Sequence, residues 1–216
     1  MTIAEFKEEL LKCPYWGEVF EKKDIIAIFL LGSQVTGCTD ERSDYDLTIV
    51  CANAHPKRDK RFLLFRGHKI HWYTYSYEQF VQTKVGHPLF SYMNVLFGFL
   101  TDECVIYINE EYREQMEKLI SLKAQIGMKG AKLFYKTQRE FVQFLLRQGE
   151  IREQDFTKFL GHLCVTKAFV FSEPLDNEKI LKAKRIRWQP TSVEDRSWIL
   201  QQLKLLEEWY THYENS

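Results

Sequence analysis

The sequence predicts an α+β protein in which a mixed β-sheet with flanking helices is followed by a C-terminal helical bundle. Three observations predict this class. Short apolar runs with the period of β-strands alternate with helical segments up to residue 108. From Glu111 onward the apolar residues recur with the period of an α-helix. Hydrophobic residues make up 45% of the 216 residues, a globular composition, and we place two small domains at residues 1–108 and 109–216.

The first half contains the predicted strands. A helix is expected near residues 3–11, and the unbroken apolar run Ile25–Leu31, which ends at Gly32, predicts a buried strand. The run of residues 44–50 alternates with a period of two, which places its two aspartates on one face of a second strand. The residues expected on the opposite face are Tyr45, Leu47 and Ile49.

Two further runs, residues 62–65 and 69–75, predict a β-hairpin with its turn at Gly67. A basic connector at residues 57–61 precedes this hairpin, and a second basic cluster follows much later at residues 182–187. Clusters of this kind are usually a solvated surface, and they are also candidate contacts for the phosphates of a nucleotide or of an RNA.

The second half is predicted to be helical because its apolar side chains form stripes with helical spacing. Thr191 and Glu194, at the spacing of a capping box, are expected to open the last helix. The two clearest stripes consist of Leu133, Phe134, Thr137, Phe141, Phe144 and Leu145, and of Trp198, Ile199, Gln202, Leu205, Leu206, Trp209 and Tyr210.

Charge and cysteine content narrow the class of protein. The 30 basic and 30 acidic side chains balance, so no overall field would hold a long nucleic acid. The five cysteines are odd in number and form no CxxC pair, which argues against a disulfide framework and against a tetrahedral zinc site. The longest apolar stretch, residues 25–31, is far shorter than the ~20 residues that cross a membrane. We therefore expect a cytoplasmic protein with no membrane segment.

The stretch that carries chemistry begins where the first strand ends. Gly32 allows a phosphate to approach the backbone closely, and Ser33 offers a hydroxyl and backbone amides to an anion. Asp44 and Asp46, two residues apart on the next strand, point to the same side. Mg²⁺ is commonly held by one or two carboxylates together with substrate phosphates. The turn and the acids together predict a site for a metal and a nucleoside triphosphate.

This arrangement, Gly-Ser followed on the next strand by Asp-x-Asp, resembles the signature of the DNA polymerase beta nucleotidyltransferase superfamily. The resemblance covers residues 24–108, and the helical second half matches the family only in general plan. It implies a nucleotidyltransferase-type mixed sheet with flanking helices. It also implies divalent metal, Mg²⁺ or Mn²⁺, at Asp44 and Asp46. The nucleotide-binding residues that it implies are Gly32, Ser33 and Ser43.

The chain departs from the family at the third acid, which active members usually carry on a later strand. The matching run here, residues 69–73, has His71 at that position. His71 is interpreted in two ways: as a metal ligand or base for the acceptor's proton, or as a strand histidine with no role. Glu78 is a weaker candidate for the missing acid.

We therefore expect an enzyme that moves a nucleoside monophosphate from a nucleoside triphosphate, ATP first among the candidates, to a hydroxyl of an acceptor. Its candidate catalytic residues are Asp44, Asp46 and His71. A small-molecule acceptor is favoured, with a protein side chain or an RNA behind it, and the oligomeric state is left open. The alternative is a catalytically silent nucleotidyltransferase-like protein that binds nucleotide or regulates a partner.

Overall fold

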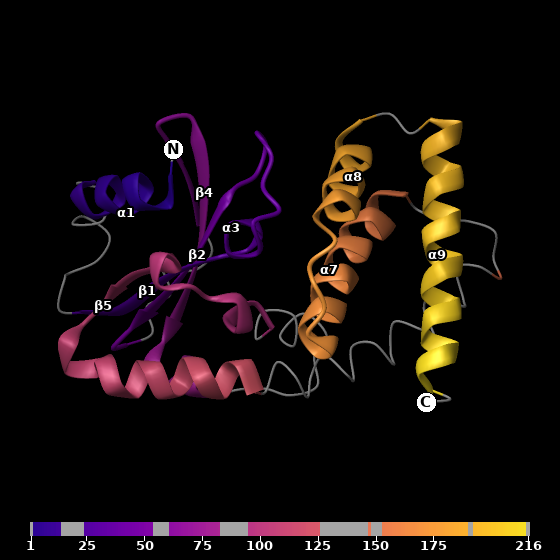
Figure 1. The fold of residues 1–216 in the computed structure, drawn as a ribbon. Coiled ribbons are helices and arrows are strands. Elements are labelled where there is room, and N and C mark those ends of the chain that lie inside the picture. Colours follow the sequence, from indigo (N-terminus) through magenta and orange to yellow (C-terminus); the bar gives the residue numbers. More distant parts are fainter. Residues whose placement is uncertain are drawn as a thin grey trace. The chain divides into compact units, whose positions relative to one another are not determined.

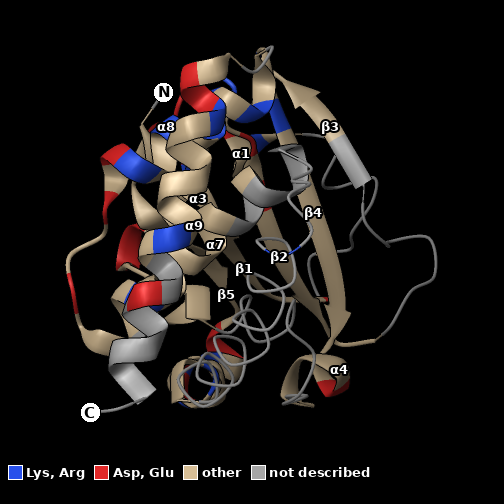
Figure 2. Ribbon diagram, turned by 90° about the vertical axis from the view of Figure 1, so that its right-hand side faces the viewer, with Lys and Arg blue, Asp and Glu red and all other residues tan. Residues whose placement is uncertain are grey.

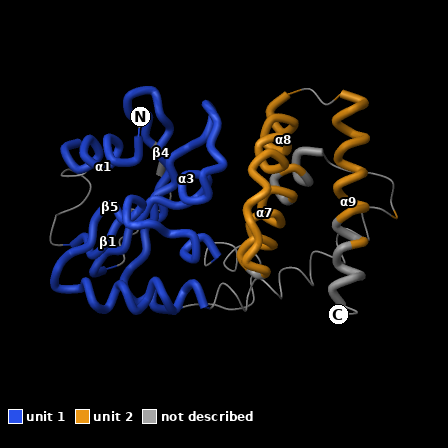
Figure 3. The backbone as a smooth tube through the Cα atoms, viewed as in Figure 1, with its two compact units in different colours: residues 1–85, 93–127 blue, residues 86–92, 128–216 orange. Residues whose placement is uncertain are grey.

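The computed structural model describes residues 2–13, 24–53, 61–82, 95–125, 147, 153–189 and 192–214. The chain divides into two compact units (Figure 3): residues 1–85 with 93–127, and residues 86–92 with 128–216. The first unit thus extends beyond residue 108, where the sequence predicted the first domain to end. A helix over residues 113–125 belongs to it, and this helix buries Met116 and Lys123.

A five-stranded mixed sheet forms the centre of the first unit, in the order β3-β4-β2-β1-β5 (Figure 1). Only the β2–β4 pair is parallel, and the other three pairs are antiparallel. The predicted α+β class with a mixed sheet is therefore confirmed. The strands are β1 (Ile25–Leu31), β2 (Tyr45–Cys51), β3 (Arg61–Phe65), β4 (His68–Ser76) and β5 (Val105–Ile108).

Short helical elements surround these strands. The α-helices of the first unit that have defined bounds are α1 (Ile3–Lys12), α3 (Ser33–Thr36) and α4 (Tyr77–Val81). The 3-10 helices are η3 (Phe97–Phe99), η4 (Asp102–Cys104) and η5 (Glu110–Tyr112).

Helix α1 covers one face of the sheet. A capping box opens it, in which the Thr2 hydroxyl accepts from the Glu5 amide and the Glu5 carboxylate accepts from the Thr2 amide. Phe6 and Leu10 are buried against the sheet, and the Phe6 ring stacks on Tyr45 with centroids 4.1 Å apart. The core on this side also contains Leu47, Ile49, Ile70, Trp72 and Ile106. The predicted inward face of the second strand is thus confirmed.

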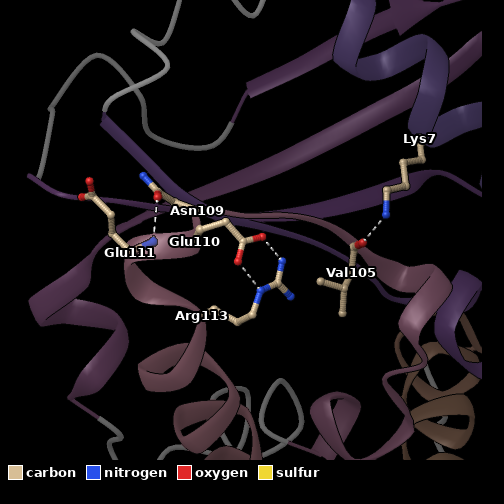
Figure 4. A network of polar contacts seen from close by, with 6 residues as sticks. All are labelled: Lys7, Val105, Asn109, Glu110, Glu111 and Arg113. Carbon is tan, nitrogen blue, oxygen red and sulfur yellow. Dashed lines mark hydrogen bonds and ion pairs between the residues drawn. The ribbon is translucent and has the colours of Figure 1, made fainter.

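Polar contacts join the edge strand β5 to α1 and stabilise the turn that follows the strand (Figure 4). The Lys7 ammonium on α1 donates to the Val105 carbonyl at 2.9 Å. Beyond the strand, the Asn109 side chain accepts from the Glu111 amide, and Arg113 makes a paired contact with Glu110. This four-residue strand was not among the predicted elements.

The hairpin of β3 and β4 has the predicted turn. Arg66 and Gly67 connect the strands, and both have positive φ angles, 49° and 80°. Two consecutive positive φ angles are what a two-residue type I′ turn requires. The turn sets Phe65 opposite His68, and the register continues to Arg61 opposite Trp72.

Aromatic rings fill the opposite face of the sheet, the face that carries Asp46. Phe29 on β1 meets Phe80 of α4 and Phe97 of η3, with ring centroids 6.1 and 5.6 Å apart. The ammonium of Lys123 lies over this cluster, 4.1 Å from the Phe80 centroid and 5.9 Å from that of Phe97. Lys123 is only 6% exposed, and burial lowers the pKa of its ammonium from 10.5 to about 8.

Replacing Lys123 by Met is expected to stabilise the fold at neutral pH, and this advantage should shrink as pH rises. Below about pH 8 the folded and unfolded chains both hold the Lys123 proton, so the folded wild type bears the full desolvation penalty. Between about pH 8 and 10.5 only the unfolded chain keeps that proton, so wild-type stability rises.

Urea unfolding of both proteins across this pH range should show the difference in free energy of unfolding narrowing by roughly 1–3 kcal/mol. Tyrosines and cysteines titrate in the same range, but they are common to both proteins and their contribution cancels. A difference that stays constant with pH would contradict the burial of a charged Lys123.

The second unit is helical in its described part, which agrees with the predicted class. It contains α7 (Glu153–Phe171), α8 (Asn177–Trp188) and α9 (Val193–Glu214). Ser192 and Asp195 open α9 with reciprocal hydrogen bonds, one residue later than the predicted pair Thr191 and Glu194. The predicted stripe from Leu133 to Leu145 lies outside the described residues. A shared core joins the helices through Leu160, Ala183, Ile186, Ile199 and Leu203.

All five cysteines are free thiols in this structure. Among the helices of the described segments, none combines the length and apolar character needed to cross a membrane.

Candidate active site

The site begins at Gly32, between β1 and α3. Gly32 has φ 71° and ψ −141°, a conformation that is open in practice only to glycine. A Cβ atom built there would overlap Asp46 Oδ2 and approach the Asp46 Cβ and Cγ to 3.2 Å. The missing side chain of Gly32 therefore makes room for the Asp46 carboxylate. The turn and the second aspartate, recognised separately in the sequence, are in direct contact.

Replacing Gly32 by Ala is expected to destabilise the protein and to displace Asp46. The unfavourable backbone conformation alone should reduce the free energy of unfolding by about 1–3 kcal/mol. Gly37→Ala is the matched control, because Gly37 has a similar φ of 69° but no atom within 4 Å of an added Cβ. Denaturant unfolding should rank Gly32→Ala as the more damaging change, and equal losses would contradict the packing of Asp46 against Gly32.

A tight turn leads into β2 and sets the position of the first aspartate. The Ser43 hydroxyl donates to Asp40 Oδ1 and accepts from the Asp40 amide, both at 2.8 Å. The Asp40 carboxylate also accepts from the Arg42 amide at 3.1 Å. Ser43, a predicted nucleotide-binding residue, thus has a structural role in this turn. Asp44 directly precedes β2, which begins at Tyr45, one residue later than predicted.

The parallel pairing of β2 with β4 sets His71 directly beside Asp46. The Nδ1 atom of His71 lies 3.8 Å from Asp44 Oδ2 and 4.0 Å from Asp46 Oδ1. The side chains of Asp44, Asp46 and His71 are 33%, 35% and 23% exposed, so solvent reaches each of them. Three predicted site residues, Asp44 just before β2, Asp46 on β2 and His71 on β4, therefore lie close together.

Tyr73 adds a polar group to the same face, two residues along β4. Burial, and secondarily the negative charge of Asp46, raise the pKa of the Tyr73 phenol above its ordinary value of 10. This hydroxyl stays protonated at neutral pH and can donate a hydrogen bond. Burial likewise raises the pKa of Tyr75 further along the strand. The alternation of side chains along β4 puts both tyrosines on the same face as His71. The sequence contains no motif that assigns them a role in the site.

The donor set suits a hard divalent cation. Both carboxylates approach a single imidazole nitrogen, so their oxygens face a shared space, and carboxylate oxygens are the ligands that Mg²⁺ and Mn²⁺ prefer. In the segments that the structure describes, no three or more His, Cys, Asp or Glu side chains are grouped so that they could hold a metal ion by themselves. Two carboxylates fit a cation that takes its other ligands from phosphates and water.

Some candidate residues do not lie near Asp44, Asp46 and His71. Glu78 lies on α4, beyond the end of β4 that is remote from His71, and it is exposed with its carboxylate near the Gln82 amide group. It is therefore not a neighbour of the aspartate pair. In the first basic cluster, residues 57–60 lie outside the described segments. Lys123 lies on the same side of the sheet as the site. No motif in the sequence marks this lysine, so it was not among the predicted site residues.

No protein-family model matches the chain, and no curated protein matches its sequence. Among solved structures, the chain is similar to a nucleotidyltransferase-like protein from Exiguobacterium sibiricum 255-15. The TM-score is 0.37 and the sequence identity 10%, over 94% of this chain and 74% of that one. A similarity at this level does not identify site residues, so their assignment rests on their own geometry.

Proposed function

We propose that this chain is a metal-dependent nucleotidyltransferase of the DNA polymerase beta superfamily. It would transfer a nucleoside monophosphate, with ATP as the expected donor, to a hydroxyl group of an acceptor. One observation carries the proposal: Gly32 is packed against Asp46, and His71 Nδ1 lies within 4.0 Å of both Asp44 and Asp46. The Gly-Ser and Asp-x-Asp signature implies a Gly-Ser turn beside the aspartate pair, and His71 stands where the family usually has a third acid.

Gly32 and Ser33 would contact the triphosphate. Helix α3 has only four residues, so its dipole is small, and the binding groups would be the Ser33 hydroxyl and the amides of the turn. The Thr36 hydroxyl donates to the Ser33 carbonyl at 3.2 Å, which holds the turn in shape. Since Gly32 has no side chain, the Asp46 carboxylate packs directly against this turn, beside the phosphates that the turn would bind.

Asp44 and Asp46 would hold Mg²⁺ or Mn²⁺, which when bound neutralises charge on the triphosphate. In the reaction, the acceptor oxygen bonds to the α-phosphorus, the bond from that phosphorus to the bridging oxygen breaks, and pyrophosphate leaves. The hydroxyl proton must go to a base. His71, whose Nδ1 atom lies within 4.0 Å of both carboxylates, is the candidate for that role. A small-molecule acceptor is favoured, with a protein side chain or an RNA end as alternatives.

A second candidate function is nucleotide binding without transfer. The observation that favours it is the position of His71, 3.8 and 4.0 Å from the two carboxylates. The imidazole stands in place of the family's usual third acid, so one carboxylate that would hold metal is missing. Such a protein would bind a nucleoside triphosphate without releasing pyrophosphate.

Incubation with each labelled nucleoside triphosphate and Mg²⁺ or Mn²⁺ tests the proposal directly. Pyrophosphate release is scored with and without candidate acceptors, and the Asp44→Asn, Asp46→Asn double variant is the blank. Metal-dependent release that the double variant lacks would support transfer. Triphosphate binding without release under every condition would favour the silent protein, and absence of binding would reject both.

A further inference from the structure

Helix α8 concentrates positive charge in a chain whose net charge is zero. It contains five basic residues against one acidic residue, Glu178, which lies in its first turn. Figure 2 colours Lys and Arg blue and Asp and Glu red on the ribbon. Lys179 pairs with the capping carboxylate of Asp176 at 3.0 Å. Of the other four cations, Lys182 lies over the Trp198 ring of α9. The remaining three and Trp188 lie at the C-terminal end of the helix, and we call them the α8 basic surface: Lys184, Arg185, Arg187 and Trp188.

An exposed indole lies among these cations. Trp188 is 55% exposed at the last position of α8. The Arg187 guanidinium carbon lies 4.8 Å from the centroid of its ring. Lys182 makes a comparable contact with Trp198 of α9, at 4.5 Å, but that tryptophan packs against the core of the unit. Trp188 is thus a large aromatic ring held beside a cation and open to solvent.

Folding requirements do not account for this exposed ring. The buried residues Ile180, Ala183 and Ile186 already anchor α8. Arginines in the last turn of a helix are stabilised by its dipole, which explains Arg185 and Arg187 without any ligand. The dipole gives no reason for leaving an indole exposed, because tryptophan is on average a highly buried residue.

We propose that the α8 basic surface binds single-stranded nucleic acid, with a base stacked on Trp188 and the neighbouring cations against backbone phosphates. Each nucleotide of a single strand has a planar base and a negatively charged phosphate. The Trp188 ring can stack on the base, and the basic side chains can pair with the phosphates. A membrane-binding helix would present a broad apolar face, whereas Trp188 is flanked by Arg185 and Arg187. With only three cations the footprint is short, and binding is strongest at low salt.

Fluorescence anisotropy of labelled short RNA and DNA strands with the full-length protein tests this proposal. No nucleotide or metal is added, so the result does not depend on nucleotidyl transfer. Trp188→Ala is expected to weaken binding roughly tenfold, which is about 1.4 kcal/mol. Arg185→Gln should lower the salt dependence, the slope of log affinity against log salt, by about 0.7.

Two matched variants on α9 of the same unit serve as controls. Lys204→Gln removes one charge from an exposed position, as Arg185→Gln does. Leu205→Ala removes a 47% exposed apolar side chain, as Trp188→Ala removes an exposed ring. Both controls should leave affinity unchanged, while binding of RNA, DNA or both by the wild type supports the proposal.

Three results would overturn the proposal. Equal losses of affinity for Arg185→Gln and Lys204→Gln would mean that the strand is attracted by the basic residues in general and not by a site on α8. Unchanged affinity in Trp188→Ala would show that no base stacks on Trp188. Binding to phosphatidylserine vesicles but not to either strand at low salt would assign the surface to a membrane instead.

Discussion

Replacing Asp44 or Asp46 by Asn is expected to abolish metal-dependent turnover while the fold survives. Each change removes a charge that would hold the cation beside the transferring phosphate, and such a loss is worth several kcal/mol, about a thousandfold in rate. Stability should change by less than about 1 kcal/mol, because both carboxylates are partly exposed and the apolar face of β2 is untouched. Pyrophosphate release and denaturant unfolding measure the two effects.

Glu78→Gln is the matched control for these variants, since it removes an exposed carboxylate of the same unit at the far end of β4. It should retain wild-type turnover, because Glu78 is not beside the aspartate pair. Turnover that persists in the Asp44→Asn, Asp46→Asn double variant would contradict the assignment of these two aspartates as metal ligands. Loss of folding in either single variant would instead give the aspartates a structural role.

Replacing His71 by Ala is expected to remove most turnover while leaving nucleotide binding nearly intact. The imidazole lies beside both carboxylates, where it can take the proton of the acceptor hydroxyl, and the loss of a positioned base typically lowers the rate by about 10²–10⁴-fold. His71→Asp should retain or raise turnover, because it restores the acid that active nucleotidyltransferases of the DNA polymerase beta superfamily usually have at this position. Steady-state kinetics and calorimetric nucleotide titration separate the two effects.

His68→Ala is the control for this experiment, because it removes the same type of side chain from the same strand. His68 lies edge-on to Tyr45, with ring centroids 5.4 Å apart, and so belongs to the α1 side of the sheet. Its replacement should leave turnover unchanged. A His71→Ala variant as active as the wild type would mean that this histidine has no part in the reaction.

Much of the first unit could be predicted because its signals are local. The unbroken apolar run of β1 and the alternating run of β2 indicate strands by themselves. The two runs around Gly67 likewise specify a hairpin. Alternation along β4 also placed His71 on one face with Tyr73, so its approach to Asp46 depended only on whether β4 would be the neighbour of β2.

The remaining features depend on contacts between distant segments, which local patterns do not report. A helical period predicts the helix over residues 113–125 but not the surface that it covers, so the first unit reaches further than residue 108. The contact between Gly32 and Asp46 requires the register of β1 with β2. Strand β5 has four residues, too few for a periodic signal to separate it from a loop.

The candidate site depends on a non-local pairing, that of β2 with β4. The β3–β4 hairpin closes across two residues, whereas Asp46 meets His71 only after a much longer loop has closed, and non-local pairings form more slowly. A shift of one residue in that pairing would set Ile70 or Trp72 opposite Asp46 in place of the imidazole. Only the observed register therefore brings Asp44, Asp46 and His71 together.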